Sequence, residues 1–335
     1  MSYDNDHKVG FFTTAIEKIL SSRNEGKALD ILDVGCNNGD LIGKLDLYFG
    51  TIISTHGVDI GAELVKMAPA GKASVGNGYD LALFPSESKD VLLYSSFLHE
   101  LGSYFTSEYF EKYSREIYYA GIKTGLKAAE RVLKQGGFLL IKDPVRPLQS
   151  SEILTLKIKD GINRVTTISE LFSKGVEKPT RDIDIGNLTE QDLQILDSVL
   201  VPNDLHYLPR MALFLKGFQW SHSQIPNGII NLQGDILTFT RDLVADISRH
   251  MPWGYSKQSF TDEQKEWYGS LNAEEWKEVL KDTGFEIESH EVTYRKSDHS
   301  KLMGNTFVIY DSKGKEIHAH DISPTHHYTV LKKIK

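Results

Sequence analysis

The sequence has a single cysteine, no long apolar run and no excess of basic residues. Cys36 cannot form a disulfide within the chain, which fits a reducing compartment. The longest apolar runs, such as residues 90–95, have the length of a strand, whereas crossing a bilayer takes roughly 20 apolar residues. The first twenty residues include acidic side chains and lack the continuous apolar stretch of a secretory signal. We therefore expect a cytoplasmic protein that crosses no membrane.

The charge balance limits the partners. A formal net charge of −8 argues against a broad surface for nucleic acid, because such binding depends on Lys and Arg that displace counterions from phosphates. A local basic face formed by Arg131, Lys134, Lys142 and Arg146 would still allow RNA to bind. Nothing in the sequence indicates an oligomeric state.

Short apolar runs alternate with helical patterns over the first 143 residues. The strand-like runs cover residues 29–34, 52–58, 73–75, 91–94 and 138–141. The helical patterns between them cover residues 41–49, 63–68 and 107–134. This alternation is typical of a parallel sheet. Apolar residues between Phe11 and Leu20 recur at spacings of three and four, which predicts an amphipathic helix before the first strand.

The pattern changes after Pro147. As far as about Ser270 helical patterns dominate, the clearest being at 190–200 and 236–250, and we interpret this stretch as an inserted helical cap. The alternation of helical patterns and strand-like runs resumes at Asn272, an N-cap residue with Glu275 three positions later. Strand candidates follow at 285–294, 306–310 and 328–331.

A strand that runs directly into a tight turn and a helix, ILDVGCNNGD at residues 31–40, is the most informative segment. Gly35 and Gly39 let the backbone approach a nucleotide cofactor closely at the end of a strand. Asn37 stands where a third glycine is usual, and asparagine tolerates a left-handed backbone. The alternative is an ordinary strand-turn-helix junction that uses glycine for its geometry alone.

The second strand candidate supports the cofactor interpretation, because it ends in Asp59. A carboxylate at this place, roughly 20 residues after a glycine turn, is positioned to accept hydrogen bonds from ribose hydroxyls. Asp59 could instead cap the next helix.

The motifs taken together resemble those of the class I S-adenosylmethionine-dependent methyltransferases. The resemblance covers residues 28–143 and 271–294, and its motifs are DVGCNNG at 33–39, VGNGYDL at 75–81, KDVLLYSSFLHEL at 89–101 and AERVLKQGGF at 129–138. A glycine turn with a downstream acid could equally serve NAD, but the LHEL segment and Gly136-Gly137 are similar to the methyltransferase pattern.

This resemblance implies an α/β fold with a Rossmann-like, mostly parallel seven-stranded sheet, helices on both faces and a helical insertion. The implied domains are residues 1–147 for cofactor binding, 148–270 for the cap and 271–335 for the rest of the sheet. The implied cofactor is S-adenosylmethionine, with S-adenosylhomocysteine as product. The residues expected to bind it are Asp33, Gly35, Cys36, Asn37, Gly39, Asp59, Ile60, Asn77, Gly78, Ser95 and Ser96.

One of these residues departs from the family pattern. Asn77 stands where the family usually has an acid that contacts the adenine amino group. An amide can still recognise that edge of the base.

The chemistry of methyl transfer adds further candidates. Transfer to an oxygen requires removal of a proton, and His99, just after the fourth strand, is the best candidate base. Glu100 could orient His99, and Tyr104, Asp143 and Arg146 could contact the acceptor. Structural roles for His99, as a packed core residue, and for Glu100, as a capping residue, are the alternatives.

The C-terminal histidines do not predict a metal site. The set comprises His318, His320, His326 and His327, with Asp321 among them, but its spacing matches no recognisable ligand pattern. We expect no metal.

The functional hypothesis is O- or N-methylation of a small-molecule acceptor bound under the cap. Methylation of RNA or another macromolecule is a second hypothesis. A non-catalytic, cofactor-binding interaction subunit is a third, suggested by the departures at Asn37 and Asn77.

Overall fold

A computed structural model describes the chain in two compact units. The described residues are 3–23, 26–109, 114–160, 165–167, 182–184, 211, 236–250, 266–268, 271–280, 283–293, 298–322 and 326–334. Unit 1 comprises residues 1–145, 270–293 and 326–335, and unit 2 comprises residues 146–269 and 294–325.

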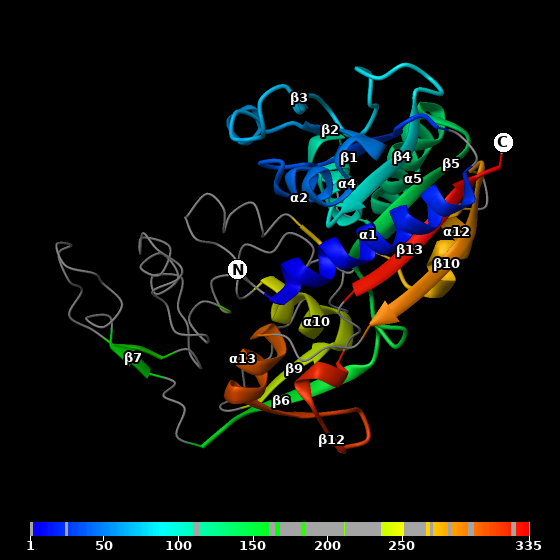
Figure 1. The fold of residues 1–335 in the computed structure, drawn as a ribbon. Coiled ribbons are helices and arrows are strands. Elements are labelled where there is room, and N and C mark those ends of the chain that lie inside the picture. Colours follow the sequence, from blue (N-terminus) through cyan, green and yellow to red (C-terminus); the bar gives the residue numbers. More distant parts are fainter. Residues whose placement is uncertain are drawn as a thin grey trace. The chain divides into compact units, whose positions relative to one another are not determined.

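Unit 1 is built on a seven-stranded sheet in the order β10-β13-β5-β4-β1-β2-β3 (Figure 1). Its strands are β1 (Leu29–Val34), β2 (Ile53–Asp59), β3 (Ala73–Val75), β4 (Lys89–Ser95), β5 (Leu133–Pro144), β10 (Phe285–Thr293) and β13 (His326–Lys333). The strands β1 to β5 pair in parallel, and β13 lies antiparallel to both β5 and β10. The predicted mostly parallel seven-stranded sheet is confirmed.

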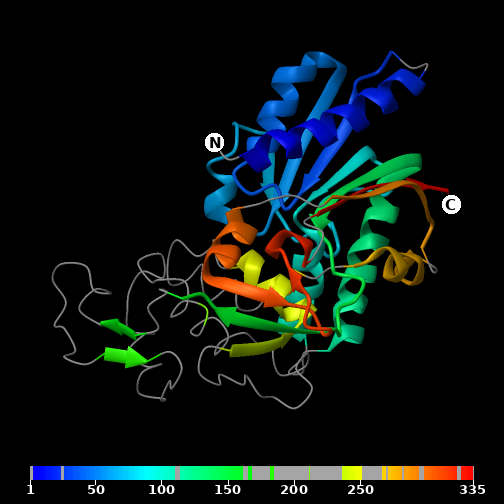
Figure 2. The same ribbon diagram turned by 90° about the horizontal axis from the view of Figure 1, so that it is seen from below.

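Helices cover both faces of this sheet. They are α1 (Tyr3–Ser22), α2 (Asp40–Phe49), α3 (Ala62–Val65), α4 (Leu98–Tyr109), α5 (Arg115–Val132) and α12 (Ala273–Leu280), with the short 3-10 helix η1 (Gly50–Ile52) after α2. Figure 2 shows α1 and α5 on opposite sides of the sheet. Phe12 and Ile16 of α1 are fully buried against β1 and β4, as the helical spacing of the apolar residues predicts.

Local capping signals determine where two of the helices begin. Asn272 Oδ1 accepts hydrogen bonds from the backbone amides of Glu274 and Glu275, while the Glu275 side chain accepts one from the Asn272 amide. This reciprocal capping box begins α12 as predicted. The predicted single helix at 107–134 is wrong, because α4 ends at Tyr109 and a second helix, capped by the Ser114 side chain, begins at Arg115.

Unit 2 contains a four-stranded antiparallel sheet in the order β12-β11-β6-β9. Its strands are β6 (Ile153–Ile158), β9 (Ile236–Thr240), β11 (Phe307–Tyr310) and β12 (Glu316–Ile317). Its helices within the described residues are α10 (Arg241–His250), α13 (Asp298–Thr306) and the 3-10 helix η4 (Ala319–Asp321). The short strands β7 (Val165–Thr167) and β8 (Asp182–Asp184) pair with each other.

These strands correct the prediction of a purely helical cap. In β6, Leu154, Leu156 and Ile158 are buried and alternate with more exposed residues, which is the two-residue period of a strand with one covered face. The predicted helix at 236–250 begins only at Arg241, since the preceding residues form β9. The predicted helix at 190–200 lies outside the described residues.

The division of the chain also differs from the predicted boundaries. Residues 294–325, expected in the C-terminal part of the first sheet, belong to unit 2, where β11 pairs with β6. In the described part of the chain, no helix is both long enough and apolar enough to span a membrane.

Candidate functional site

The turn after β1 adopts the backbone that its sequence predicts. Gly35, Asn37 and Gly39 all have positive φ angles, of 72°, 52° and 73°. The backbone amides of Gly35 and Cys36 both donate to the carbonyl oxygen of Val58 at the end of β2, at 2.9 and 3.1 Å. The left-handed conformation expected of Asn37 is therefore confirmed, and the loop is anchored to the neighbouring strand.

Asp59 fixes the same loop through its side chain. One carboxylate oxygen accepts a hydrogen bond from the Asn37 amide at 2.8 Å, and the other accepts one from the Gly61 amide at 2.8 Å. The side chain is half-buried, so it joins the glycine turn to the segment that follows β2. Asp59 is not the N-cap residue of α3, because that position is occupied by Gly61.

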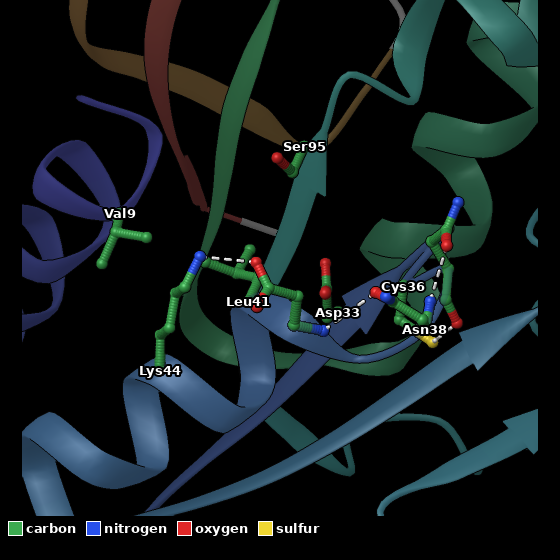
Figure 3. A pocket seen from close by; sticks show the side chains of 10 residues that line it. Val9, Asp33, Cys36, Asn38, Leu41, Lys44 and Ser95 are labelled. Carbon is green, nitrogen blue, oxygen red and sulfur yellow. Dashed lines mark hydrogen bonds and ion pairs between the residues drawn. The ribbon is translucent and has the colours of Figure 1, made fainter. Parts of the chain in front are cut away.

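A pocket of about 460 Å³ opens at this end of the sheet. Its lining includes five residues predicted from the sequence, Asp33, Gly35, Cys36, Asn37 and Ser95. It also includes five that were not predicted, Val9, Asn38, Asp40, Leu41 and Lys44. Figure 3 shows Val9 and Lys44 on one side of the pocket, Cys36 and Asn38 on the other, and Ser95 at the end of β4.

The pocket suits a nucleotide-sized cofactor. Its volume falls in the range of roughly 300–1,000 Å³ that small-molecule sites occupy. Ser95 is 7% exposed, and among the described residues its hydroxyl has no hydrogen-bond partner. Because a buried hydroxyl without a partner is costly, this group is suited to a polar ligand. Ser95 and the backbone of the glycine turn would hold S-adenosylmethionine here. Asp59 does not line the pocket and would act by fixing the turn.

Phe97, which the sequence analysis did not single out, explains two of the glycines. A Cβ atom on Gly35 would lie 2.5 Å from Phe97 Cδ2, and one on Gly78 would lie even closer to the same ring. Both glycines therefore make room for Phe97, in addition to any closer approach of a cofactor. The position of Phe97 two residues after β4 was the available signal, but it does not reveal which loops the ring contacts.

The remaining predicted cofactor residues lie near this loop without lining the pocket. Asn77 uses its amide oxygen to accept a hydrogen bond from the Tyr79 backbone, so that oxygen stabilises a turn. Ile60 is 73% exposed. Ser96 has a φ of 57°, and its backbone amide donates to the Lys142 carbonyl at the end of β5. Such strained residues often occur at functional sites.

Cys36 is a protonated thiol in this environment. Burial, together with the negative charges of Asp33 and Asp59, raises its pKa to about 12. Because the thiolate is the nucleophile, Cys36 is not suited to covalent chemistry near neutral pH. It contributes to the pocket by its size and polarity.

His99 and Asp143 form a buried pair where β4 and β5 end. His99 Nδ1 lies 2.7 Å from Asp143 Oδ1, and the side chains are 3% and 0% exposed. The other carboxylate oxygen accepts from the backbone amides of Leu98 and His99 at the start of α4. An ionised carboxylate only accepts hydrogen bonds, so Nδ1 carries the proton and the lone pair is on Nε2.

This geometry changes the role expected of Asp143. It was predicted to contact the acceptor, but it is fully buried and its two oxygens are engaged by α4. Asp143 therefore orients His99. Glu100 and Tyr104 lie on α4 and are half-buried, and neither they nor His99 line the pocket described above.

Arg146 belongs to unit 2 and is engaged there. Its Nε donates to Asp242 at 2.9 Å, one terminal nitrogen donates to Ser150, and the guanidinium lies 5.5 Å from the Trp267 ring centroid. The predicted contact between Arg146 and an anionic acceptor stays a prediction.

The basic face proposed for RNA is not formed as expected. Arg131 donates to the carbonyl oxygens of residues 80, 81 and 84, and Lys134 pairs with Asp90 at 3.0 Å. Lys142 and Arg146 are buried, at 2% and 5% exposure. Of these four cations, two are therefore engaged by neighbouring groups and two are buried.

The C-terminal histidines divide between the two units. His318 and His320 stack on each other in unit 2, whereas His326 and His327 lie on β13 in unit 1. Among the described residues, no group of three or more His, Cys, Asp or Glu side chains is arranged to hold a metal ion.

One family of known proteins matches part of the chain. The family described as methyltransferase domain matches residues 32–141, which is less than half of the chain. A comparison with curated proteins found no significant match.

Solved structures of low identity resemble the chain. One is a SAM-dependent methyltransferase from Methanosarcina mazei, with 13% identity, coverage of 94% of this chain and 97% of that one, and a TM-score of 0.41. Another is the YcgJ protein from Bacillus subtilis, with 12% identity, 98% coverage of both chains and a TM-score of 0.40. The plantazolicin methyltransferase BamL has 12% identity, with 98% of this chain and 85% of that one covered and a TM-score of 0.41.

At such identities the assignment depends on the family match and on the loop. The matched segment runs from β1 into β5 and contains the glycine turn, Asp59 and His99. Residues 32–141 therefore carry a methyltransferase domain, and S-adenosylmethionine is its cofactor.

Proposed function

We propose that the chain methylates an oxygen or nitrogen atom of a small-molecule acceptor and that His99 removes the proton of that atom. The observation that carries this proposal is the 2.7 Å hydrogen bond between His99 Nδ1 and Asp143 at the ends of β4 and β5. A buried carboxylate that fixes the orientation of an imidazole and supports its positive charge is the arrangement used in general-base catalysis.

The cofactor supplies a methyl group activated by a sulfonium centre. The chain then has to hold the acceptor in line with that methyl group and take up one proton. With Nδ1 donating to Asp143, His99 accepts the acceptor's proton at Nε2 and becomes an imidazolium. Asp143 stabilises this cation, because the two groups are buried together.

A small acceptor is favoured over RNA by the charges of the chain. The formal net charge is −8, and the four cations considered for an RNA surface are buried or engaged with neighbouring groups. Binding a phosphate backbone depends on accessible Lys and Arg side chains.

The acceptor class can be tested with cofactor labelled in its methyl group. The protein is incubated with labelled S-adenosylmethionine and, separately, with a metabolite extract below about 3 kDa, with total RNA and with total protein, small metabolites being the size that enclosed pockets accommodate. We expect label only in the small-molecule product. Label in RNA or protein would contradict the proposal.

A His99→Gln variant tests the base. We expect transfer to fall by about 10²–10⁴-fold, the usual contribution of a general base. Affinity for S-adenosylhomocysteine, measured by calorimetry, should stay near wild type because His99 does not line the pocket. Full transfer in the variant would exclude His99 as the base. Cofactor binding without transfer to any acceptor pool would instead favour the interaction-subunit hypothesis.

A further inference from the structure

A histidine of β13 lies directly beside the His99–Asp143 pair. His327 and Asp143 are register partners across the antiparallel β13–β5 pairing, so their side chains project from the same face of the sheet. Both side chains are fully buried, at 0% exposure. On this face, His327 is therefore the cross-strand neighbour of the carboxylate that orients His99.

A threonine hydroxyl holds the His327 ring. Thr329 Oγ1 lies 2.9 Å from His327 Nδ1 and 2.7 Å from His290 Nδ1. A hydroxyl has one proton, so it donates to one imidazole and accepts from the other. The two rings are thereby held in complementary tautomers, and His327 Nδ1 is engaged by Thr329 and not by Asp143.

Aromatic rings enclose His327 on its other sides. The Trp276 ring of α12 lies 5.3 Å away at 66°, and the His290 ring of β10 lies 5.6 Å away. This burial lowers the pKa of His327 to about 3, although the charge of Asp143 acts in the opposite direction. His327 is therefore uncharged near neutral pH and does not compete with His99 as a cation for the carboxylate.

We propose that His327 is a positioning residue of the methyl-transfer site, whose imidazole closes the sheet side of Asp143 to water. The carboxylate of Asp143 then accepts hydrogen bonds from His99 and from the backbone amides at the start of α4, without competition from water. Water admitted beside Asp143 would offer it competing hydrogen bonds and weaken its hold on His99. This inference rests on the proposed role of His99 as the base.

The role can be measured without a methyl acceptor. In ¹⁵N-histidine-labelled protein free of ligand, the hydrogen-bonded Nδ1 proton of His99 gives an NMR signal, identified by its loss in His99→Gln. Its rate of exchange with water reports how well Asp143 is enclosed. The readout stays available even if the protein transfers no methyl group, so a failure of the proposed function and a failure of this inference are distinguishable.

Three variants separate enclosure from general stability. In His327→Ala we expect exchange to be faster by about tenfold or more, equivalent to easing local opening by about 1.4 kcal/mol. His327→Phe restores the volume and should exchange like wild type. His290→Phe removes the other imidazole bound to Thr329. His290 pairs with Thr329, one row away from the His327–Asp143 row, so this variant should also leave the rate unchanged.

Several results would overturn the proposal. These are unchanged exchange in His327→Ala, an equal increase in His327→Phe, or an equal increase in His290→Phe. If His327→Ala does not fold, Thr329→Val and Thr329→Ser carry the test. Valine removes the hydroxyl that holds the ring and should speed exchange, whereas serine keeps it and should not. Equal rates in these two variants would contradict the role of His327.

Discussion

Replacing Asp59 with alanine tests whether the glycine turn is built for the cofactor. The carboxylate holds two backbone amides, those of Asn37 and Gly61, each at 2.8 Å. A hydrogen bond to a charged group contributes about 1.5–3 kcal/mol, and exposure to solvent reduces this toward about 1 kcal/mol. The bond to Asn37 is exposed and the one to Gly61 is half-buried, so together they order the loop by about 2 kcal/mol.

That energy becomes lost affinity, since the cofactor has to order a loop that Asp59 no longer fixes. About 2 kcal/mol corresponds to roughly 30-fold weaker binding. Contacts of the carboxylate with the cofactor itself would add to this loss. The free energy of unfolding should change little, because the energy lost on loop ordering then appears in the affinity and not in the stability of the ligand-free protein.

Isothermal calorimetry with S-adenosylhomocysteine measures the affinity, and urea unfolding measures the stability. Glu63→Ala is the matched control. It removes a nearby negative charge that, within the described ranges, pairs with exposed Lys66 alone and makes no bond to the loop, so affinity should not change. Wild-type affinity in Asp59→Ala would refute the assignment of this loop to the cofactor.

Other predictions follow from individual residues. Gly35→Ala should lower the melting temperature, because its φ is 72° and the added Cβ would meet Phe97; Phe97→Ala in the same chain should recover part of the loss, as calorimetry would show. Cys36, whose pKa is raised to about 12, should resist iodoacetamide at pH 8 until urea unfolds the protein, and rapid alkylation of the native form would contradict its burial. His327 has a pKa of about 3 when folded and 6.5 when unfolded, so the unfolded chain takes up the proton first and stability falls as pH decreases below 6.5. The loss from this residue between pH 7 and pH 5 should be about 2 kcal/mol and should be absent in His327→Phe, as urea unfolding at both pH values would reveal.

Local signals account for what the sequence predicts well. The glycine turn, the left-handed Asn37 and the capping box at Asn272 each depend on a few adjacent residues, and the structure has all three. The central strands β1, β4 and β5 follow because they are short apolar runs separated by helices, whereas the full seven-stranded sheet was expected from the family resemblance.

The misjudged parts depend on contacts between distant segments. In β6, Leu154, Leu156 and Ile158 alternate with more exposed residues, as in a strand. A run this short is compatible with either a helix or a strand when only its own sequence is considered. Strand β6 pairs with β9, roughly 80 residues later, and with β11, roughly 150 residues later, and no local pattern indicates these pairings. Phe97 was missed for the same reason, since its contacts are with Gly35 and Gly78 in other loops.

The two segments of unit 2 are inserted between segments of unit 1, and the places where the chain crosses explain why the first sheet tolerates them. Pro144, His326 and Thr293 stand in one row of the first sheet, because His326 is the register partner of both others. The chain leaves unit 1 just after Pro144 and just after Thr293, and it returns at Ser270 and just before His326. Strands β10 and β13 complete the sheet beyond β5 using residues of unit 1 alone. The second insertion, residues 294–325, begins and ends at this row, so it can differ in length and sequence without changing the strands that position Asp143 and Asp59.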